Sequence, residues 1–464
     1  MTIAVARSSL RTSLLRYGRS WGLWLLLLVA PVGARYMIPR GDGSGTVIAI
    51  GGRLPEMTAP FLGVSLGIVV STLLLPIGWM YLRSNTTRRQ PWQVEEVTAA
   101  SRVSIALGRW AADAAILLGM LAALTIAGWI LAFVVPLVGP RNLLQLTAAL
   151  WLVAAPALLG VAALRILFDA IPFTRGGWGD FGYFVFWMGS LIMPMAAQDR
   201  APGLVANMYD FAGFIRPLQY GAPGGTDNFA IGGVDNILPG HVRLGGMAGA
   251  LSPRYIASRL LWVAIAFAVA ALAGAVYQPH RATGRIIVPG RLRRWLDGGA
   301  PPPAAVAAAP AGAAAIPVFG LLAAEFRLIG AGRLFKLLGA AVAIAALVQD
   351  FRHVASPAAL LLLIFALTAH AGRSEARGLL LLTNTAPLSP WLRRAAFVVA
   401  GTGWSLLLTA PAVLTTPVGT ILGYAAATGA IAAGISIALA TFTRSAFAPR
   451  MVLLVLWYGY LSAA

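Results

Sequence analysis

Few side chains in this chain have the types and spacing that chemistry requires. The only lysine, Lys336, lies in Gly-Arg-Leu-Phe-Lys-Leu, which is not the Gly-x-x-x-x-Gly-Lys-Ser/Thr loop that cradles nucleotide phosphates. The histidines are far apart, and none has a second histidine at the spacing that binds zinc. These are His241, His280, His353 and His370. There is no cysteine, so thiolate sites and disulfides are excluded. The sequence predicts no catalytic, metal or cofactor site.

Three aspartates are the remaining candidates for acid–base work. Asp113 lies near the start of one expected membrane span, Asp169 near the end of the next, and Asp180 beside the span after that. No carboxylate lies in the middle of an apolar run, where proton and ion carriers place theirs. The three aspartates leave one alternative open, which is a membrane enzyme that acts on a lipid-linked substrate and uses arginines to hold its phosphates.

Two basic segments occupy equivalent places in the two halves of the chain. Each follows the second long apolar run of its half and precedes the third. Val97, Ala100, Val103 and Leu107 recur at helical spacing in the first segment, which predicts an amphipathic helix at the cytoplasmic surface. The charged residues that we expect to meet a cytoplasmic partner are Arg88, Arg89, Glu95, Glu96 and Arg102 in the first segment, and Arg373, Glu375 and Arg377 in the second.

The elements that position these segments are membrane-spanning helices. The chain has 464 residues, of which 59% are hydrophobic and 11% are charged, and a soluble domain could not bury so much apolar surface. Apolar runs long enough to cross a bilayer recur throughout. They lie near 21–37, 61–82, 111–135, 146–168, 181–197, 260–277, 334–348, 358–370, 395–413, 418–440 and 451–463. We therefore predict an all-α, polytopic membrane protein with about 11 (10–12) transmembrane helices.

The arginines set the predicted orientation. The net charge of +20 gathers at the ends of apolar runs and not on one soluble face, which argues against nucleic acid as a partner. The loops and ends on one side of the membrane hold more arginines than those on the other. The arginine-rich side includes the N-terminus, which is therefore predicted to be cytoplasmic. The arginines on that side are Arg7, Arg11, Arg16, Arg19, Arg83, Arg88, Arg89, Arg102, Arg109, Arg281, Arg285, Arg291, Arg293, Arg294, Arg373, Arg377, Arg393 and Arg394.

The chain divides into two predicted halves. Residues 1–280 hold about six spans, residues 281–317 are an Arg-containing and then Ala/Pro-rich cytoplasmic linker, and residues 318–464 hold about five spans. Each half begins with an expected interfacial helix, at 7–21 and at 325–336, although the first could also be a signal peptide. The long extracytoplasmic loop, 198–257, is glycine-rich, and we expect it to form turns that act as a lid or meet an extracytoplasmic partner.

This layout resembles the permeases of ABC-2 type exporters. Their halves start with an interfacial helix and two spans, followed by a basic cytoplasmic segment and a leucine-glycine-basic motif that leads into the third span. Arg377-Gly378 through Ala386-Pro387-Leu-Ser389 fits this pattern, and so does Leu107-Gly108-Arg109, although Ala100-Ser101 replaces the expected proline. The second half also lacks a sixth span.

The resemblance implies a multi-pass permease of a bacterial plasma (inner) membrane, surrounded by membrane lipids. Its two basic segments would dock on separate ATP-binding cassette ATPase subunits, and ATP hydrolysis there would drive outward movement of a substrate. The eight charged residues named above would make that contact as coupling residues. Two alternatives stay open, namely the membrane enzyme described above and a non-catalytic membrane scaffold.

Overall fold

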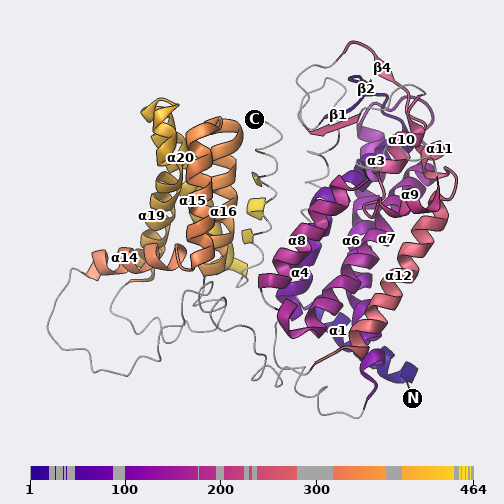
Figure 1. Cartoon of the computed structure of the whole chain (residues 1–464), viewed down its shortest axis with the longest axis horizontal. Coiled ribbons are helices and arrows are strands. Elements are labelled where there is room, and N and C mark those ends of the chain that lie inside the picture. The colour runs from indigo at the N-terminus through magenta and orange to yellow at the C-terminus, as the bar shows by residue number, and fades with distance from the viewer. Residues whose placement is uncertain are drawn as a thin grey trace. The chain divides into compact units, whose positions relative to one another are not determined.

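The computed structural model describes the chain in segments, almost all of them helical. These are residues 2–19, 27, 35, 38, 47–86, 100–175, 177–194, 203–223, 229–232, 238–278, 317–372, 389–443, 449, 450, 452–454, 456, 457 and 460. The chain forms two compact units, Met1–Arg285 and Ile286–Ala464 (Figure 1). The predicted linker, 281–317, lies outside the described residues except at its last position.

The helices confirm a multi-pass helical membrane protein. Among the described residues, seven helices are long and apolar enough to cross a membrane. They are Ala59–Arg83, Arg102–Val134, Leu143–Ala170, Tyr255–Ala275, Phe351–His370, Pro390–Leu414 and Val418–Phe442. The predicted span at 334–348 belongs to a bent helix pair, and the one at 181–197 is a short helix. Those at 21–37 and 451–463 lie largely outside the described residues.

Helix α7 (Leu143–Ala170) is the centre of the first unit. It packs against α3 (Ala59–Val69), α6 (Arg102–Val134) and α12 (Tyr255–Ala275). Gly63 lets α3 approach closely, because a Cβ atom there would lie 2.3 Å from the backbone oxygen of Leu146. Small residues give such close helix contacts in membranes, where backbone packing takes over from the hydrophobic effect.

A π-helical turn, η1 (Val70–Leu74), joins α3 to α4 (Leu75–Thr86) within one span. Helix α8 (Gly177–Ile192) donates hydrogen bonds to one carbonyl of this turn and to the carbonyl that follows it. The Trp187 indole donates to the Ser71 carbonyl at 2.8 Å, and the Tyr183 hydroxyl donates to the Leu75 carbonyl at 2.9 Å. The Tyr183 ring also stacks on Trp79, with 4.0 Å between ring centroids. Helix α8 is therefore fixed to the span by polar contacts.

The capped end of the first unit is formed by two loops that are distant in sequence. Strand β1 (Val47–Ile50) pairs antiparallel with β3 (Phe229–Gly232), so that Val47 lies opposite Gly232. Strand β2 (Leu54–Pro55) pairs parallel with β4 (His241–Val242). The short helices of the cap are α9 (Leu204–Met208), α10 (Ile215–Gly221) and α11 (Gly246–Ala250). The described parts of the predicted loop 198–257 thus form strands and short helices, while its glycines Gly224, Gly225 and Gly233 lie outside the described residues.

Buried polar groups tie this cap to α12. Arg259 of α12 is 2% exposed and donates to the backbone oxygens of Asn207, at 3.1 Å, and Asp210. The Asp210 carboxylate accepts the backbone N–H groups of Gly213 and Arg216, each at 2.8 Å. The strands and the α1 helix (Thr2–Gly18) lie at opposite ends of this unit (Figure 1).

The second unit begins with a sharp bend. Helix α14 (Pro317–Ile329) meets α15 (Arg333–Val348) at 83°, and Gly332 between them has a φ of 99°. Helix α14 packs on α19 (Pro390–Thr409), where the Trp404 ring stacks on Phe326 with centroids 4.6 Å apart. The remaining elements are η5 (Phe351–Ala355), α16 (Ser356–His370), η6 (Ala410–Leu414) and α20 (Val418–Thr443).

Candidate charged site at the basic end of the first unit

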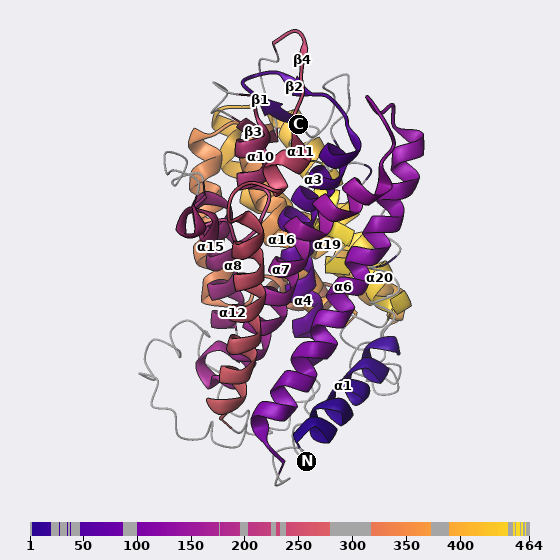
Figure 2. The same ribbon diagram turned by 90° about the vertical axis from the view of Figure 1, so that its right-hand side faces the viewer.

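Helix α1 packs on the first turns of α6 (Figure 2). We call the end of the first unit at which these two helices meet the basic end. A Cβ atom on Gly108 would lie 2.3 Å from the backbone oxygen of Ala6, so only glycine permits this approach. The Ser9 hydroxyl donates to the Ile105 carbonyl at 3.2 Å. The Ser101 hydroxyl accepts the Ser104 N–H and caps α6. The glycine of Leu107-Gly108-Arg109 therefore has a packing role.

Most of the predicted amphipathic surface helix lies outside the described residues, and the rest belongs to a longer helix. Residues 102–134 form one continuous helix, so the described part of that segment is the beginning of a span. Its first two turns bury Ser104, Ala106 and Gly108, and the half-buried Leu107 packs on a core cluster of α7 and α12, as the prediction expects of the apolar stripe. Helix α1 packs on the side of α6 that carries the small residues, because the two backbones approach closely there. Val97 lies outside the described residues.

A chain of buried ion pairs crosses this end of the bundle. The Tyr17 hydroxyl of α1 donates to Asp113 of α6 at 2.5 Å. Arg165 of α7 pairs with Asp113 at 2.9 Å and with Asp169, one turn further along α7, at 2.8 Å. Arg83 of α4 pairs with the other oxygen of Asp169 at 2.9 Å. Four helices are thereby joined through alternating charges.

The burial of this network makes its pairing essential. Arg165 is 0% exposed, Asp113 2% and Tyr17 4%. An ion taken out of water costs several kcal/mol, which is offset only if each charge keeps its partner and its hydrogen bonds. Removal of one member leaves its partner as an unpaired buried charge, which lowers the stability of the fold by about 3–5 kcal/mol for a buried pair. The network therefore holds α1, α4, α6 and α7 together, and its contribution to stability depends on every member.

The turn after α7 extends the network to α12. In this turn, η2 (Pro172–Arg175), the Arg175 Nε donates to the Asp169 carbonyl at 2.6 Å, and its Nη2 donates to the Gln278 carbonyl. Arg83 donates to the carbonyls of Thr174, at 3.1 Å, and Arg175, at 2.7 Å. The ends of α4, α7 and α12 are consequently held in one arrangement.

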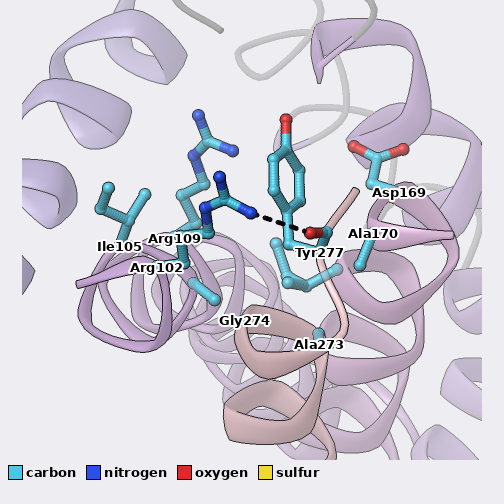
Figure 3. Close-up of a pocket in the computed structure, with 10 residues that line it drawn as sticks. Arg102, Ile105, Arg109, Asp169, Ala170, Ala273, Gly274 and Tyr277 are labelled. Atoms are coloured by element: carbon cyan, nitrogen blue, oxygen red, sulfur yellow. Dashed lines mark hydrogen bonds between the residues drawn. The ribbon is translucent and has the colours of Figure 1, made fainter. Parts of the chain in front are cut away.

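A small pocket opens beside the network (Figure 3). Its volume is about 40 Å³, and it lies between α6, α7 and α12. Arg102 and Arg109 form one side, Asp169 lies on the opposite side, and Tyr277 lies between them. Arg102 Nη1 donates to the Tyr277 carbonyl at 3.2 Å. The pocket thus has guanidinium donors on one wall and aliphatic side chains on much of the rest.

Only one of the eight predicted coupling residues can be placed. Arg102 is exposed at the first turn of α6 and lines this pocket. The others lie outside the described residues, namely Arg88, Arg89, Glu95, Glu96, Arg373, Glu375 and Arg377. Whether they meet an ATPase stays a prediction.

The structure brings two of the three candidate aspartates together. Asp113 and Asp169 share Arg165, and each of their four carboxylate oxygens already has a phenol or guanidinium partner. This geometry is that of ion-pair partners. The side chain of Asp180 lies outside the described residues. No group of three potential metal ligands occurs in the described part of the chain.

Sequence reasoning missed Arg165 and Tyr17. A signal for Arg165 did exist, because an arginine inside an apolar run needs a carboxylate, and Asp169 follows it by one helical turn. Nothing in the sequence pointed to Tyr17, whose partner lies 96 residues away.

The fold and this site define a multi-pass helical membrane protein with a buried charge network at its basic end. No protein-family model, curated protein or solved structure matches the chain.

Proposed function

We propose that the chain is the membrane-spanning permease of an ABC-2 type exporter in a bacterial inner membrane, and that a separate ATP-binding cassette subunit drives it. The observation that carries the proposal is the attachment of α1 to the first turns of α6, directly after the segment 87–99 that holds four of the predicted coupling residues. In this proposal the basic end faces the cytoplasm, as its arginines favour.

The packing within each unit supports two related halves. In the first unit the leading helix α1 packs on α6, α6 on α7, and α3 on α7. In the second unit the leading helix α14 packs on α19, α19 on α20, and α16 on α20. Counted along each proposed half, these are the same pairs, with the leading helix on the third span, the third on the fourth, and the second on the fourth. About eleven spans in two repeats fit this scheme.

The charge network suggests how a push on the cytoplasmic surface would travel. A partner that presses on 87–101 moves the start of α6, and α1 moves with it because Gly108 and Tyr17 hold the two helices together. Arg165 and Asp169 pass the displacement to α7 and α4. Packed elements of this kind move as rigid bodies. The capped end would then open or close as the lid of the exit path.

Co-purification with an ATPase tests this proposal. We expect the tagged chain, extracted in mild detergent, to bring down an ATP-binding subunit that hydrolyses ATP. Charge reversal in both segments, with Glu95→Lys and Glu96→Lys combined with Arg373→Glu and Arg377→Glu, should reduce this association at least tenfold, because the docking charges then repel.

The matched control is Arg141→Glu, a charge reversal at an exposed position between α6 and α7. It should leave the association unchanged. A chain that purifies alone and without ATP hydrolysis, or equal loss in the control, would contradict the proposal.

A further inference from the structure

The pocket at the basic end carries more positive than negative charge. Arg83, Arg102, Arg109, Arg165 and Arg175 gather at this end, against two carboxylates from Asp113 and Asp169 in the described residues. Both carboxylates already pair with guanidinium groups of the network. Arg109, inside the pocket, experiences the positive charges of Arg165 and Arg16 as well as the negative charge of Asp169. Such a setting attracts an anion.

The geometry of the donors suits a phosphate. Arg102 and Arg109 lie seven residues apart on α6, so both guanidinium groups project from the same side of the helix toward the pocket (Figure 3). A guanidinium group is a planar fork of N–H donors that matches two phosphate oxygens at once. The volume of about 40 Å³ holds a group of a few non-hydrogen atoms and not a large solute.

The far wall belongs to the end of α12. Ala273, Gly274 and Tyr277 line the pocket, while the adjoining face of α12 exposes Leu272 and Val276, at 51% and 39%. An apolar face beside a basic pocket at the end of a membrane span accommodates an acyl chain below its headgroup. Arg102 and Arg175 also lie over the Tyr277 ring, with guanidinium carbons 5.7 and 5.5 Å from its centroid.

We infer that this pocket binds an anionic phosphate group, and that the apolar face beside it favours a phospholipid headgroup over free phosphate. The bound phosphate would accept hydrogen bonds from Arg102 and Arg109 of α6, and Arg102 also donates to the Tyr277 carbonyl just after α12. The inference stands apart from the exporter proposal, since the site is complete within the first unit and needs no ATPase.

Lipid titration of the purified full chain tests the inference. We expect phosphatidylglycerol, added to the detergent-solubilised protein and followed by native mass spectrometry, to bind at least tenfold more tightly than phosphatidylcholine, whose choline offsets the phosphate charge. The double variant Arg102→Gln and Arg109→Gln should lose at least tenfold in phosphatidylglycerol affinity. The control Arg141→Gln, an exposed arginine outside the pocket, should keep the affinity of the parent chain.

Two further arms separate the remaining outcomes. Inorganic phosphate should raise the thermal unfolding midpoint only weakly, and a strong effect of phosphate without lipid selectivity would assign the site to a soluble anion. Ile105→Phe fills the pocket without a change of charge and should also weaken phosphatidylglycerol binding, which covers the case in which the arginine variant does not fold. Parent-like binding in both variants, or equal loss in Arg141→Gln, would overturn the inference.

Discussion

Gly108 is the residue on which the contact between α1 and α6 depends. We expect Gly108→Val to destabilise the protein by about 1–3 kcal/mol, because the new side chain would force α1 away from α6. The loss should appear as a lower thermal unfolding midpoint in detergent and as faster proteolysis within α1.

The control for this substitution lies on the same helix. A Cβ atom added at Gly119 would meet no neighbour within 4 Å, so Gly119→Val should change stability by less than about 1 kcal/mol. If both variants unfold alike, the effect comes from helix propensity and the packing argument fails.

Tyr17 gives a pH-dependent test of the buried network. Burial, followed by the negative charge of Asp113, raises the pKa of the Tyr17 phenol well above its usual value of 10.0. The folded protein therefore keeps the proton above pH 10 while the unfolded chain releases it. The stability that Tyr17 contributes is complete below about pH 10 and falls as the pH rises further.

Tyr17→Phe should cost about 1–3 kcal/mol at neutral pH, since Asp113 loses a buried donor. Its stability should also fall less steeply than that of the parent between pH 9 and 11. The other tyrosines contribute equally to both proteins, so the difference between their unfolding midpoints isolates Tyr17. A constant difference across this pH range would argue against a buried, protonated phenol.

At the same scale, the sequence was informative about single charges but not about their partners. Asp113 and Asp169 could be recognised as candidates because carboxylates near apolar runs are rare. Their pairing through Arg165 could not, since 52 residues separate Asp113 from Arg165 and only helix packing brings them together. The same packing turned Gly108 from a motif residue into a helix contact.

Among the elements, the bend between α14 and α15 depends on Gly332. Its φ of 99° with a ψ of 142° is a backbone conformation that residues other than glycine rarely adopt. We expect Gly332→Ala to lower stability by about 1–3 kcal/mol, seen as a lower unfolding midpoint. Gly320→Ala within α14, where no neighbour lies within 4 Å, should be neutral or slightly stabilising. A neutral Gly332→Ala would mean that the bend is readily straightened.

Element by element, long apolar periodicity was the reliable signal. The seven spans follow directly from runs of about 20 apolar residues. The elements that could not be predicted from the sequence are those held in place by contacts with residues far away in the chain. Helix α8 is fixed by hydrogen bonds to the π-helical turn of the span Ala59–Arg83 and to the residue after that turn, and the strands of the cap pair across about 180 residues.

For the whole molecule, the absence of cysteine makes the orientation directly measurable. Single cysteines at two exposed positions of the first unit, Ser8→Cys in α1 and Arg141→Cys between α6 and α7, report its two ends. We expect a membrane-impermeant maleimide to label Arg141→Cys in intact cells and Ser8→Cys only after the membrane is broken. The cysteine-free parent is the control, and the reverse pattern would refute the cytoplasmic placement of the basic end.

At this scale the sequence predicted the class of protein because composition alone demands a membrane environment. It could not decide whether the two basic segments meet a partner, since most of the charged residues chosen for that role lie outside the described part of the chain.

The cap also constrains the order in which the chain can be completed. Strand β1 leaves the ribosome long before its partner β3, which follows some 180 residues later. Synthesis at about 5–20 residues per second leaves β1 with unsatisfied backbone groups for roughly 10–40 seconds. The first unit therefore completes its strand pairs only after its early helices have been made, and during that interval a factor that shields exposed strand edges would have its greatest effect on yield.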